Sequence, residues 1–254
     1  MRNIKIVLEY DGSKFFGFQK QPRKITVQSS LEKAMARLFD RPVKIKAASG
    51  RTDAGVHARH QVVNFKVDSR LQPYQIQRGL NRYLPADISV MAVEEAAENF
   101  NARFDVQSKI YEYRVWNGPV RSPLEAPSSH HVMARLNLPA MRKAAKLLTG
   151  RLDFAAFCGA DARRGKKGFS EKKTHTVRTV RRFDIRRKGF LIRFILEGDG
   201  FLNHMVRNMV GTVLDVGRGR LRWSDVPEIL RQKDRRKAGM AVPACGLTLV
   251  SVTY

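Results

Sequence analysis

The sequence is poor in cysteine, in acidic residues and in long apolar runs. Its two cysteines, Cys158 and Cys245, have no C-x-x-C spacing, so we expect neither a disulfide framework nor a zinc knuckle, and a reducing cytoplasm suits the chain. No segment approaches the roughly 20 apolar residues of a membrane span. The apolar run at the N-terminus meets Glu9 and Asp11 too early for a signal peptide. We therefore expect a soluble cytoplasmic protein.

The shortage of acidic residues leaves a large positive charge. The chain has 48 Lys and Arg against 23 Asp and Glu, a formal charge of +25. Such an excess costs self-repulsion in the folded state, and Lys and Arg are the residues that neutralise phosphates when nucleic acid binds. A membrane-surface role usually brings a basic amphipathic helix or a lipidation signal, and the sequence has neither. The charge therefore predicts a nucleic acid partner.

Hydrophobic patterning predicts an α+β fold. Segments rich in β-branched and aromatic residues predict strands at 4–10, 62–67, 111–116, 177–186, 190–197 and 247–254. Helices are expected at 31–39, capped by Ser29 or Ser30, and at 73–83, 139–149 and 202–216. The order strand, helix, strand, helix, strand occurs before residue 107 and roughly again after it. We therefore expect two similar α/β halves, 1–107 and 108–254, with their sheets joined around a central cleft.

Basic residues are densest in one Gly-interrupted segment and in the strand expected after it. Only Glu171 and Asp184 oppose them. A charge run is often no more than a solvated surface, but the overall charge of the chain favours RNA contact here. The run comprises Arg163, Arg164, Lys166, Lys167, Lys172, Lys173, Arg178, Arg181, Arg182, Arg186, Arg187 and Lys188.

The most informative segment is 48–58, which reads ASGRTDAGVHA and precedes an expected strand. Gly50 and Gly55 flank the polar trio Arg51, Thr52 and Asp53. Since glycine permits positive φ and close backbone approach, the loop is shaped to present this trio in a fixed direction. It is not a phosphate-binding loop, because it has neither a Gly-x-Gly-x-x-Gly nor a Walker pattern. On spacing alone, a surface ion pair between Arg51 and Asp53 fits equally well.

Metal binding is not expected. The six histidines show no H-E-x-x-H or other ligand spacing, so packing or polar satisfaction is the simpler interpretation of each. They are His57, His60, His130, His131, His175 and His204.

At the 48–58 segment the chain closely resembles the TruA family of pseudouridine synthases, in which GRTDAGVHA surrounds the catalytic aspartate. The resemblance covers essentially the whole chain: YDGS at 10–13, GFQ at 17–19, ARF at 102–104, KIYEY at 109–113, MVRNMVG at 205–211 and GL at 246–247 also match. It implies a pseudouridine synthase fold with a central catalytic cleft, no cofactor, and a homodimer that binds tRNA. The implied targets are uridines 38 to 40 of the anticodon stem-loop, recognised by shape and phosphate.

The resemblance also implies roles for four residues. Asp53 matches the nucleophile, and a carboxylate suits that task because it is charged at neutral pH and leaves readily after attack. Tyr111 matches the tyrosine that lies against the target base, where its ring stacks and its hydroxyl can assist proton transfer from carbon 5. Arg207 matches the arginine that keeps the aspartate charged. Arg51 would organise the loop or hold the displaced pairing partner of the flipped base.

Two positions depart from the family pattern, and two rival functions stay open. Phe18 stands where a tryptophan is usual, and His60 stands where a glycine is usual; we expect neither to touch the nucleophile.

One rival function is a catalytically silent RNA-binding protein on the same scaffold. The other is a pseudouridine synthase with a different RNA target. Intact Asp53, Tyr111 and Arg207 argue against the first rival, and the compact length argues against the second.

Overall fold

The computed structural model describes residues 1–159 and 176–254, and the chain divides into two compact units. Unit 1 comprises Met1–Lys109 and Thr248–Tyr254, and unit 2 comprises Ile110–Leu247. The predicted basic residues Arg163, Arg164, Lys166, Lys167, Lys172 and Lys173 lie outside the described residues. Among the helices of the described part, none is both long and apolar enough to cross a membrane.

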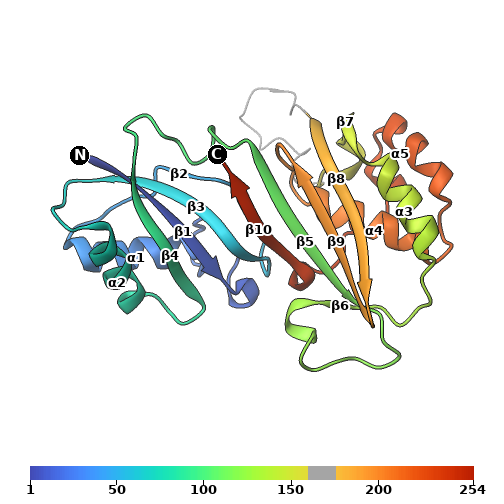
Figure 1. The fold of residues 1–254 in the computed structure, drawn as a ribbon, viewed down its shortest axis with the longest axis horizontal. Coiled ribbons are helices and arrows are strands. Elements are labelled where there is room, and N and C mark those ends of the chain that lie inside the picture. The colour runs from blue at the N-terminus through green and yellow to red at the C-terminus, as the bar shows by residue number, and fades with distance from the viewer. Residues whose placement is uncertain (160–175) are drawn as a thin grey trace. The chain divides into compact units, whose positions relative to one another are not determined.

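Unit 1 is built on a sheet whose strands follow the order β4-β1-β3-β10 (Figure 1). Its strands are β1 (Arg2–Tyr10), β3 (His57–Val67), β4 (Ile88–Ala96) and β10 (Leu247–Thr253), with the short β2 (Ala47–Ala48) paired to β3. β1 runs antiparallel to both of its neighbours, and β10 runs parallel to β3. The register places Tyr10, at the end of β1, opposite Ala58 at the start of β3.

Two helices bury the apolar side chains of unit 1. They are α1 (Val27–Phe39) and α2 (Pro73–Tyr83). The Asn81 side chain of α2 brackets Val90 of β4, accepting from its N–H at 2.7 Å and donating to its carbonyl at 2.9 Å. Fully buried side chains of the sheet and helices form the core, and their removal from water is the main stabilising term. The largest are Ile4, Ile6, Leu8, Leu31, Met35, Phe65, Ile76 and Leu80.

In unit 2 the strands follow the order β5-β9-β8-β7. They are β5 (Ser108–Trp116), β7 (Gly150–Asp153), β8 (Val177–Lys188) and β9 (Leu191–Gly198), with β6 (His130–His131) parallel to β5. The helices are α3 (Leu138–Leu147), α4 (Met205–Gly217) and α5 (Val226–Gln232). α3 packs against β8 and against α4, where Met141 meets Gly217. The buried aromatic residues Tyr113, Phe154, Phe157 and Phe194 fill the core of this unit.

The α+β prediction is confirmed, and each of the six predicted strands and four predicted helices forms within a few residues of its expected place. α1 begins earlier than predicted because Thr26, and not Ser29 or Ser30, is its N-cap. α4 begins at Met205, three residues after the predicted start, because His204 adopts a left-handed conformation at φ 57°. The sequence patterns do not predict β2, β4, β6, β7 or α5. β10, which is expected in the C-terminal half, pairs with β3 of unit 1.

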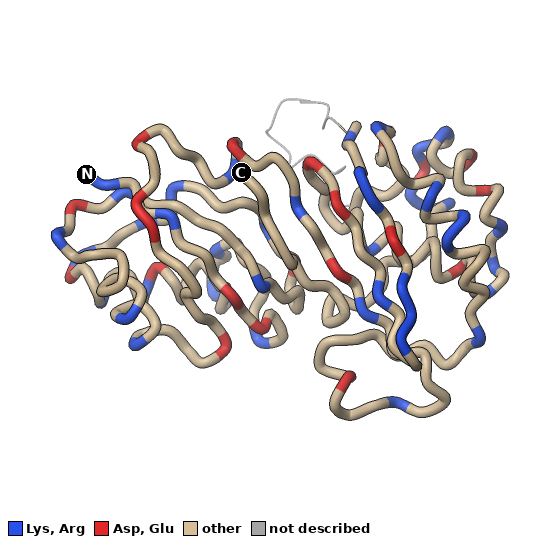
Figure 2. The backbone as a smooth tube through the Cα atoms, in the orientation of Figure 1, with Lys and Arg blue, Asp and Glu red and all other residues tan. Residues whose placement is uncertain are grey.

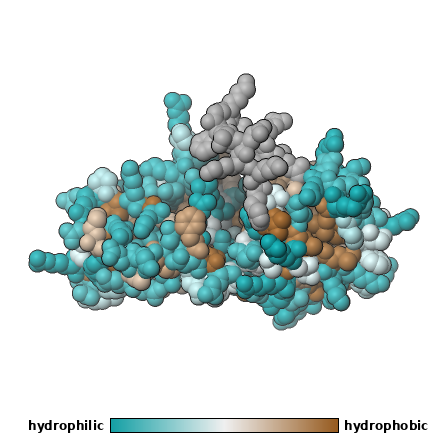
Figure 3. Space-filling view, turned by 90° about the horizontal axis from the view of Figure 1, so that it is seen from above, coloured by the Kyte–Doolittle hydropathy of each residue, from teal (hydrophilic) through white to brown (hydrophobic). Residues whose placement is uncertain are grey.

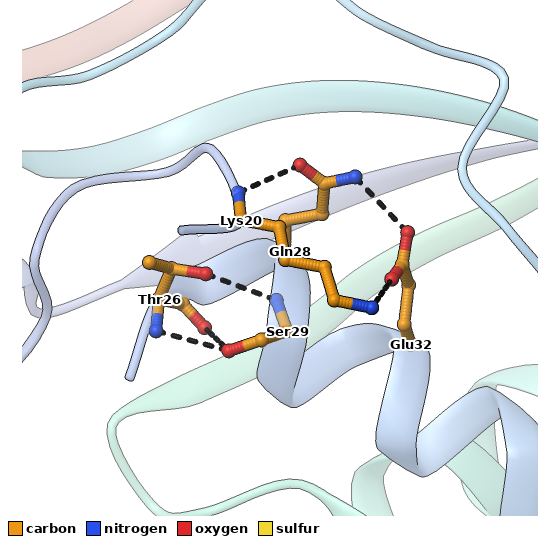
Figure 4. A network of polar contacts seen from close by, with 5 residues as sticks. All are labelled: Lys20, Thr26, Gln28, Ser29 and Glu32. Atoms are coloured by element: carbon orange, nitrogen blue, oxygen red, sulfur yellow. Dashed lines mark hydrogen bonds and ion pairs between the residues drawn. The ribbon is translucent and has the colours of Figure 1, made fainter. Parts of the chain in front are cut away.

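The start of α1 is fixed by a reciprocal hydrogen-bond pair (Figure 4). Thr26 is extended, and its hydroxyl oxygen accepts the Ser29 N–H at 3.2 Å. The Ser29 hydroxyl in turn accepts the Thr26 N–H at 3.0 Å. These contacts satisfy backbone N–H groups that a helix end leaves without internal partners.

Replacing Thr26 with valine keeps the side-chain shape and removes the acceptor, so Thr26→Val should lower the free energy of unfolding by about 1 kcal/mol. Urea unfolding followed by circular dichroism measures the change. Thr253→Val is the control, because Thr253 is exposed at the end of β10 and caps no helix. Equal midpoints for Thr26→Val and the wild type would show that the cap is dispensable.

Candidate active site

The loop that carries Asp53 is anchored at its base to β3. The Ser49 N–H donates to the carbonyl of Val62 at 2.8 Å, and the Gln61 side chain donates to the carbonyl of Gly50 at 2.7 Å. Ser49 and Gln61 are both fully or almost fully buried. Since buried polar groups are costly unless they are paired, these bonds hold the base of the loop in one position.

Thr52, the residue before Asp53, is held by both its side chain and its backbone. Its hydroxyl lies 2.8 Å from the hydroxyl of Tyr10, and the Phe18 N–H donates to its carbonyl at 3.0 Å. Tyr10, Phe18 and Thr52 are all buried, whereas Asp53 is half-buried and Arg51 is exposed. The buried contacts therefore fix the backbone from which the Asp53 carboxylate projects. Phe18, which stands where the family usually has tryptophan, thus contacts Thr52, the residue before Asp53, through its backbone N–H.

Two glycines let residues 12–18 approach the Asp53 loop at backbone distance. A Cβ atom on Gly17 would lie 2.7 Å from the Thr52 carbonyl oxygen, and Gly17 has φ +82°. A Cβ atom on Gly12 would lie 2.0 Å from the Val56 carbonyl oxygen. The predicted glycine of the loop itself, Gly55, also has positive φ, at 79°, and closes a turn in which the Val56 N–H donates to the Asp53 carbonyl.

His57 adds a further contact between the Asp53 loop and the segment after β1, where it meets Asp11 and Gly12. His57 Nδ1 lies 3.0 Å from Asp11 Oδ1 and 3.2 Å from the Gly12 nitrogen. Burial raises the pKa of Asp11, but hydrogen bonds from Ser13 and the charge and hydrogen bond of His57 outweigh it, so the net pKa is lowered. His57 thus satisfies polar groups at the edge of the loop, in line with the interpretation of the histidines from sequence. His60, the other departure from the family pattern, accepts the Val252 N–H at 3.3 Å.

In unit 2, the two tyrosines of β5 lie on the same side of the sheet. Tyr111 is 8% exposed, and its ring meets Phe201 edge-on at 5.3 Å between centroids and 87° between planes. Tyr113 is fully buried and donates to the Pro243 carbonyl at 2.9 Å. Burial raises the pKa of Tyr113 well above its usual range, with a smaller opposing effect from the charge of Arg207. Tyr113 is therefore a neutral core residue.

Arg207 lies in the first turn of α4 and is fixed to the segment before β10. Its Nε donates to the Val242 carbonyl at 2.8 Å, and the Val242 N–H donates to the Arg207 carbonyl at 3.3 Å. The next residue, Asn208, is buried and bridges two segments, donating to the Phe157 carbonyl and accepting from Arg235, each at 2.7 Å. The Nε bond to Val242 thus holds one edge of the Arg207 guanidinium group, while Asn208 fixes the helix that carries it.

Basic residues are concentrated along β8, as their positions on the backbone show (Figure 2), and we call them the ridge. Val180, Phe183 and Ile185 of the strand are buried, whereas its basic residues are half-buried or exposed. Glu197 lies 3.5 Å from Arg182, and Asp184 lies 3.6 Å from Arg186. The described part of the ridge comprises Arg178, Arg181, Arg182, Arg186, Arg187 and Lys188.

The motifs YDGS at 10–13 and GFQ at 17–19 carry the family resemblance, but the sequence alone predicts no role for their residues. The structure explains both motifs: Tyr10 binds Thr52, and Gly12 and Gly17 make room for the loop. The signal was the pair of glycines after a strand, which marks close backbone approach. Within residues 1–159 and 176–254, no three His, Cys, Asp or Glu side chains are grouped so as to hold a metal ion.

Comparison with known proteins gives one consistent result. A family model described as tRNA pseudouridine synthase matches residues 6–105 and 144–254. A protein of Pelobacter propionicus named tRNA pseudouridine synthase A is 44% identical over 254 residues, which is 100% of both chains. Proteins of the same name from Geobacter sulfurreducens and Caldicellulosiruptor bescii are 42% and 40% identical, again over 100% of each chain.

Gly17→Ala should distort the Asp53 loop. Left-handed backbone costs alanine about 1–2 kcal/mol, and here the added methyl group also meets the Thr52 carbonyl. Gly219→Ala is the matched control, since Gly219 has φ +74° and nothing within 4 Å of its Cβ position. We expect the NMR amide shifts of residues 52–55 to move in Gly17→Ala alone, together with a larger loss of stability on urea unfolding. Undisturbed shifts in Gly17→Ala would refute the contact.

Proposed function

The chain belongs to the tRNA pseudouridine synthase family, and on that premise we propose that it converts uridines 38, 39 and 40 of the tRNA anticodon stem-loop to pseudouridine. It is an isomerase, because the product has the same atoms as the substrate. We propose Asp53 as the nucleophile and no cofactor, since the reaction needs neither a redox group nor an energy source. The fixed presentation of Asp53 by buried contacts is the observation that carries the assignment.

The reaction breaks the bond between ribose C1′ and uracil N1, turns the base, and joins C1′ to C5. C5 then loses its proton and N1 gains one, either the same proton or one from solvent. Asp53 attacks C1′, attacks C6 of the base, or removes a ribose proton to give a glycal; all three routes use its carboxylate. Each requires the carboxylate to meet one atom of the substrate within a small range of positions. The buried hydrogen bonds of Thr52 and the tight packing of Gly17 limit the backbone of Asp53 in that way.

Tyr111 and Arg207 complete the proposed machinery. Tyr111 stacks on the uracil ring, and its hydroxyl assists removal of the C5 proton. Its edge-on contact with Phe201 restricts the ring to one orientation, which favours stacking. Arg207 is the proposed cationic partner of the reacting carboxylate, and its bond to Val242 reduces the conformational entropy lost when it pairs. Arg51 is exposed, which suits the proposed contact with the displaced pairing partner.

The proposed recognition of tRNA is by shape and charge. A uridine in a stem is out of reach until it is flipped from the helix, which costs a few kcal/mol of stacking and pairing. The charge of +25 and the ridge on β8 offer phosphate contacts that offset this cost. We propose that the enzyme acts in the cytoplasm as a homodimer, as the family resemblance implies, with one tRNA spanning both subunits.

The assignment is tested with Asp53→Asn, which keeps the side-chain volume and removes the charge. Incubated with an unmodified tRNA transcript, it should form pseudouridine at positions 38–40 at least about 10³-fold more slowly than the wild type. Chemical mapping of pseudouridine is the measurement. Asp40→Asn is the control, because Asp40 is exposed and sits at φ 50°, a conformation that asparagine tolerates well.

The possible outcomes of this assay separate the reaction, the nucleophile and the RNA target. Modification by the wild type and Asp40→Asn alone supports both the reaction and the nucleophile. Full activity of Asp53→Asn refutes the nucleophile but keeps the reaction. Tight binding of the tRNA without modification by any of the proteins refutes the proposed target and favours a silent RNA-binding protein or a synthase with another RNA substrate.

Tyr111→Phe separates stacking from proton transfer. The ring remains, so KM should stay within about twofold, whereas kcat should fall by about 10²-fold or more if the hydroxyl takes part in removing the C5 proton. Release of tritium from tRNA labelled at uridine C5 measures that step directly. Tyr74→Phe is the control, since Tyr74 is 59% exposed at the start of α2. An unchanged kcat in Tyr111→Phe would leave the tyrosine with a stacking role only.

A further inference from the structure

The segment 12–26 presents an apolar and basic surface next to the Asp53 loop. Phe16 is 48% exposed and Ile25 is 64% exposed, although Phe15 and Phe18 on either side of Phe16 are buried. The segment has no acidic residue and four basic ones, Lys14, Lys20, Arg23 and Lys24. On the face seen in Figure 3, hydrophilic residues predominate and apolar residues form separate patches. Exposed aromatic residues among basic residues are typical of surfaces that bind single-stranded nucleic acid.

The backbone of Phe16 is held by hydrogen bonds from within the same segment. The Phe16 N–H donates to the Ile25 carbonyl at 2.9 Å, and the Gln21 side chain donates to the Phe16 carbonyl at 2.8 Å. The two exposed apolar residues are thus paired through their backbones. A surface whose backbone is already ordered loses little conformational entropy when a ligand binds to it.

The segment is also attached to α1, as the close view shows (Figure 4). The Lys20 N–H donates to the Gln28 side chain at 2.9 Å, and the Lys20 ammonium pairs with Glu32 at 3.0 Å. Gln28 in turn donates to Glu32 at 3.0 Å. These contacts hold the outer part of the segment, so the exposure of Phe16 is not a result of a loose loop.

Phe16 lies between two residues that contact the Asp53 loop. The carbonyl of Phe15 accepts the Gly55 N–H at 3.3 Å, and Gly17 packs against Thr52. Phe16 is therefore one residue along the chain from each of two contacts with the loop that carries Asp53. Nucleotides that flank a uridine held at Asp53 can then reach this segment.

Lys24 differs from the other lysines of the segment. Lys14 and Lys20 each pair with a carboxylate, Asp87 and Glu32, at 3.0 Å. The Lys24 ammonium instead lies 4.1 Å above the centre of the Phe16 ring. A cation–π contact at an exposed site is weak, and the ammonium group keeps donors for a further anion.

We propose that Phe16 and Lys24 form a contact for a nucleotide that flanks the target uridine. Phe16 provides a surface for the base, extended by Ile25, and Lys24 binds the adjacent phosphate. The inference rests on the proposed function, because that function supplies the RNA. Stacking does not depend on base identity, since every base has a π face, so this contact suits an enzyme with several adjacent target positions and many tRNAs.

The test measures binding of an unmodified tRNA transcript in the Asp53→Asn background at several salt concentrations. Phe16→Ala should weaken binding about tenfold, and Phe16→Trp should stay within about threefold of the parent. Lys24→Gln should reduce the slope of log K against log salt by about 0.7–0.9, whereas Phe16→Ala leaves that slope unchanged. Met91→Ala is the control, since Met91 is 52% exposed on β4 of the same unit.

With Asp53 intact, Phe16→Ala should raise KM and leave kcat unchanged, as expected for contacts made equally before and during reaction. Parental affinity and KM in Phe16→Ala would overturn the inference. So would a loss of binding that Phe16→Trp does not restore, because that indicates a structural role. If the wild type makes no pseudouridine, the proposed function fails, while the binding measurements with the same transcript still decide whether Phe16 and Lys24 contact RNA.

Discussion

The backbone contact between residues 12–18 and the Asp53 loop is the constraint on which the candidate site depends. Two glycines are needed for it, because a Cβ atom on Gly12 or Gly17 would enter the space of the Val56 or Thr52 carbonyl. The contact carries hydrogen bonds to Thr52 and Gly55, on both sides of Asp53. A carboxylate at the end of a short side chain has few torsions of its own, so fixing its backbone fixes most of its position. Such preorganisation supplies much of the rate enhancement in many enzymes.

The sheet of unit 1 makes that contact possible. The register of β1 with β3 brings Tyr10 opposite Ala58, so the segment after β1 emerges beside the loop that enters β3. A shift of one residue would turn Tyr10 to the other face of the sheet and remove its hydroxyl from Thr52. The buried residues Ile4, Ile6 and Leu8 set this register, because only one alternation buries them. Core packing thereby determines the geometry of a polar site several residues away.

The sequence predicted the elements well and their polar ends poorly. Helix 73–83 was placed at its observed bounds, because a proline opens it and its apolar residues follow the helical period. The sequence did not predict Thr26 as the N-cap of α1. The reason is that Ser29 occupies the third helical position, where the usual capping box has Glu or Gln. The pairing of β10 with β3 had no local signal, since strand pairing between chain ends depends on the whole fold. For the site, motif resemblance predicts Asp53 as the nucleophile, and the structure gives Tyr10, Gly12 and Gly17 a physical role in holding its loop.

The same contact links the chemistry to RNA binding. Segment 12–26 holds the Asp53 loop with buried backbone groups, and on its outer side it carries Phe16 and Lys24. A uridine that leaves its helix loses stacking on both sides, and the nucleotides next to it lose a neighbour. An aromatic surface and a cation on this segment can compensate for that loss. In the proposed contact the binding energy at the flanking nucleotide is available equally before and during the reaction, so it lowers KM and leaves kcat unchanged.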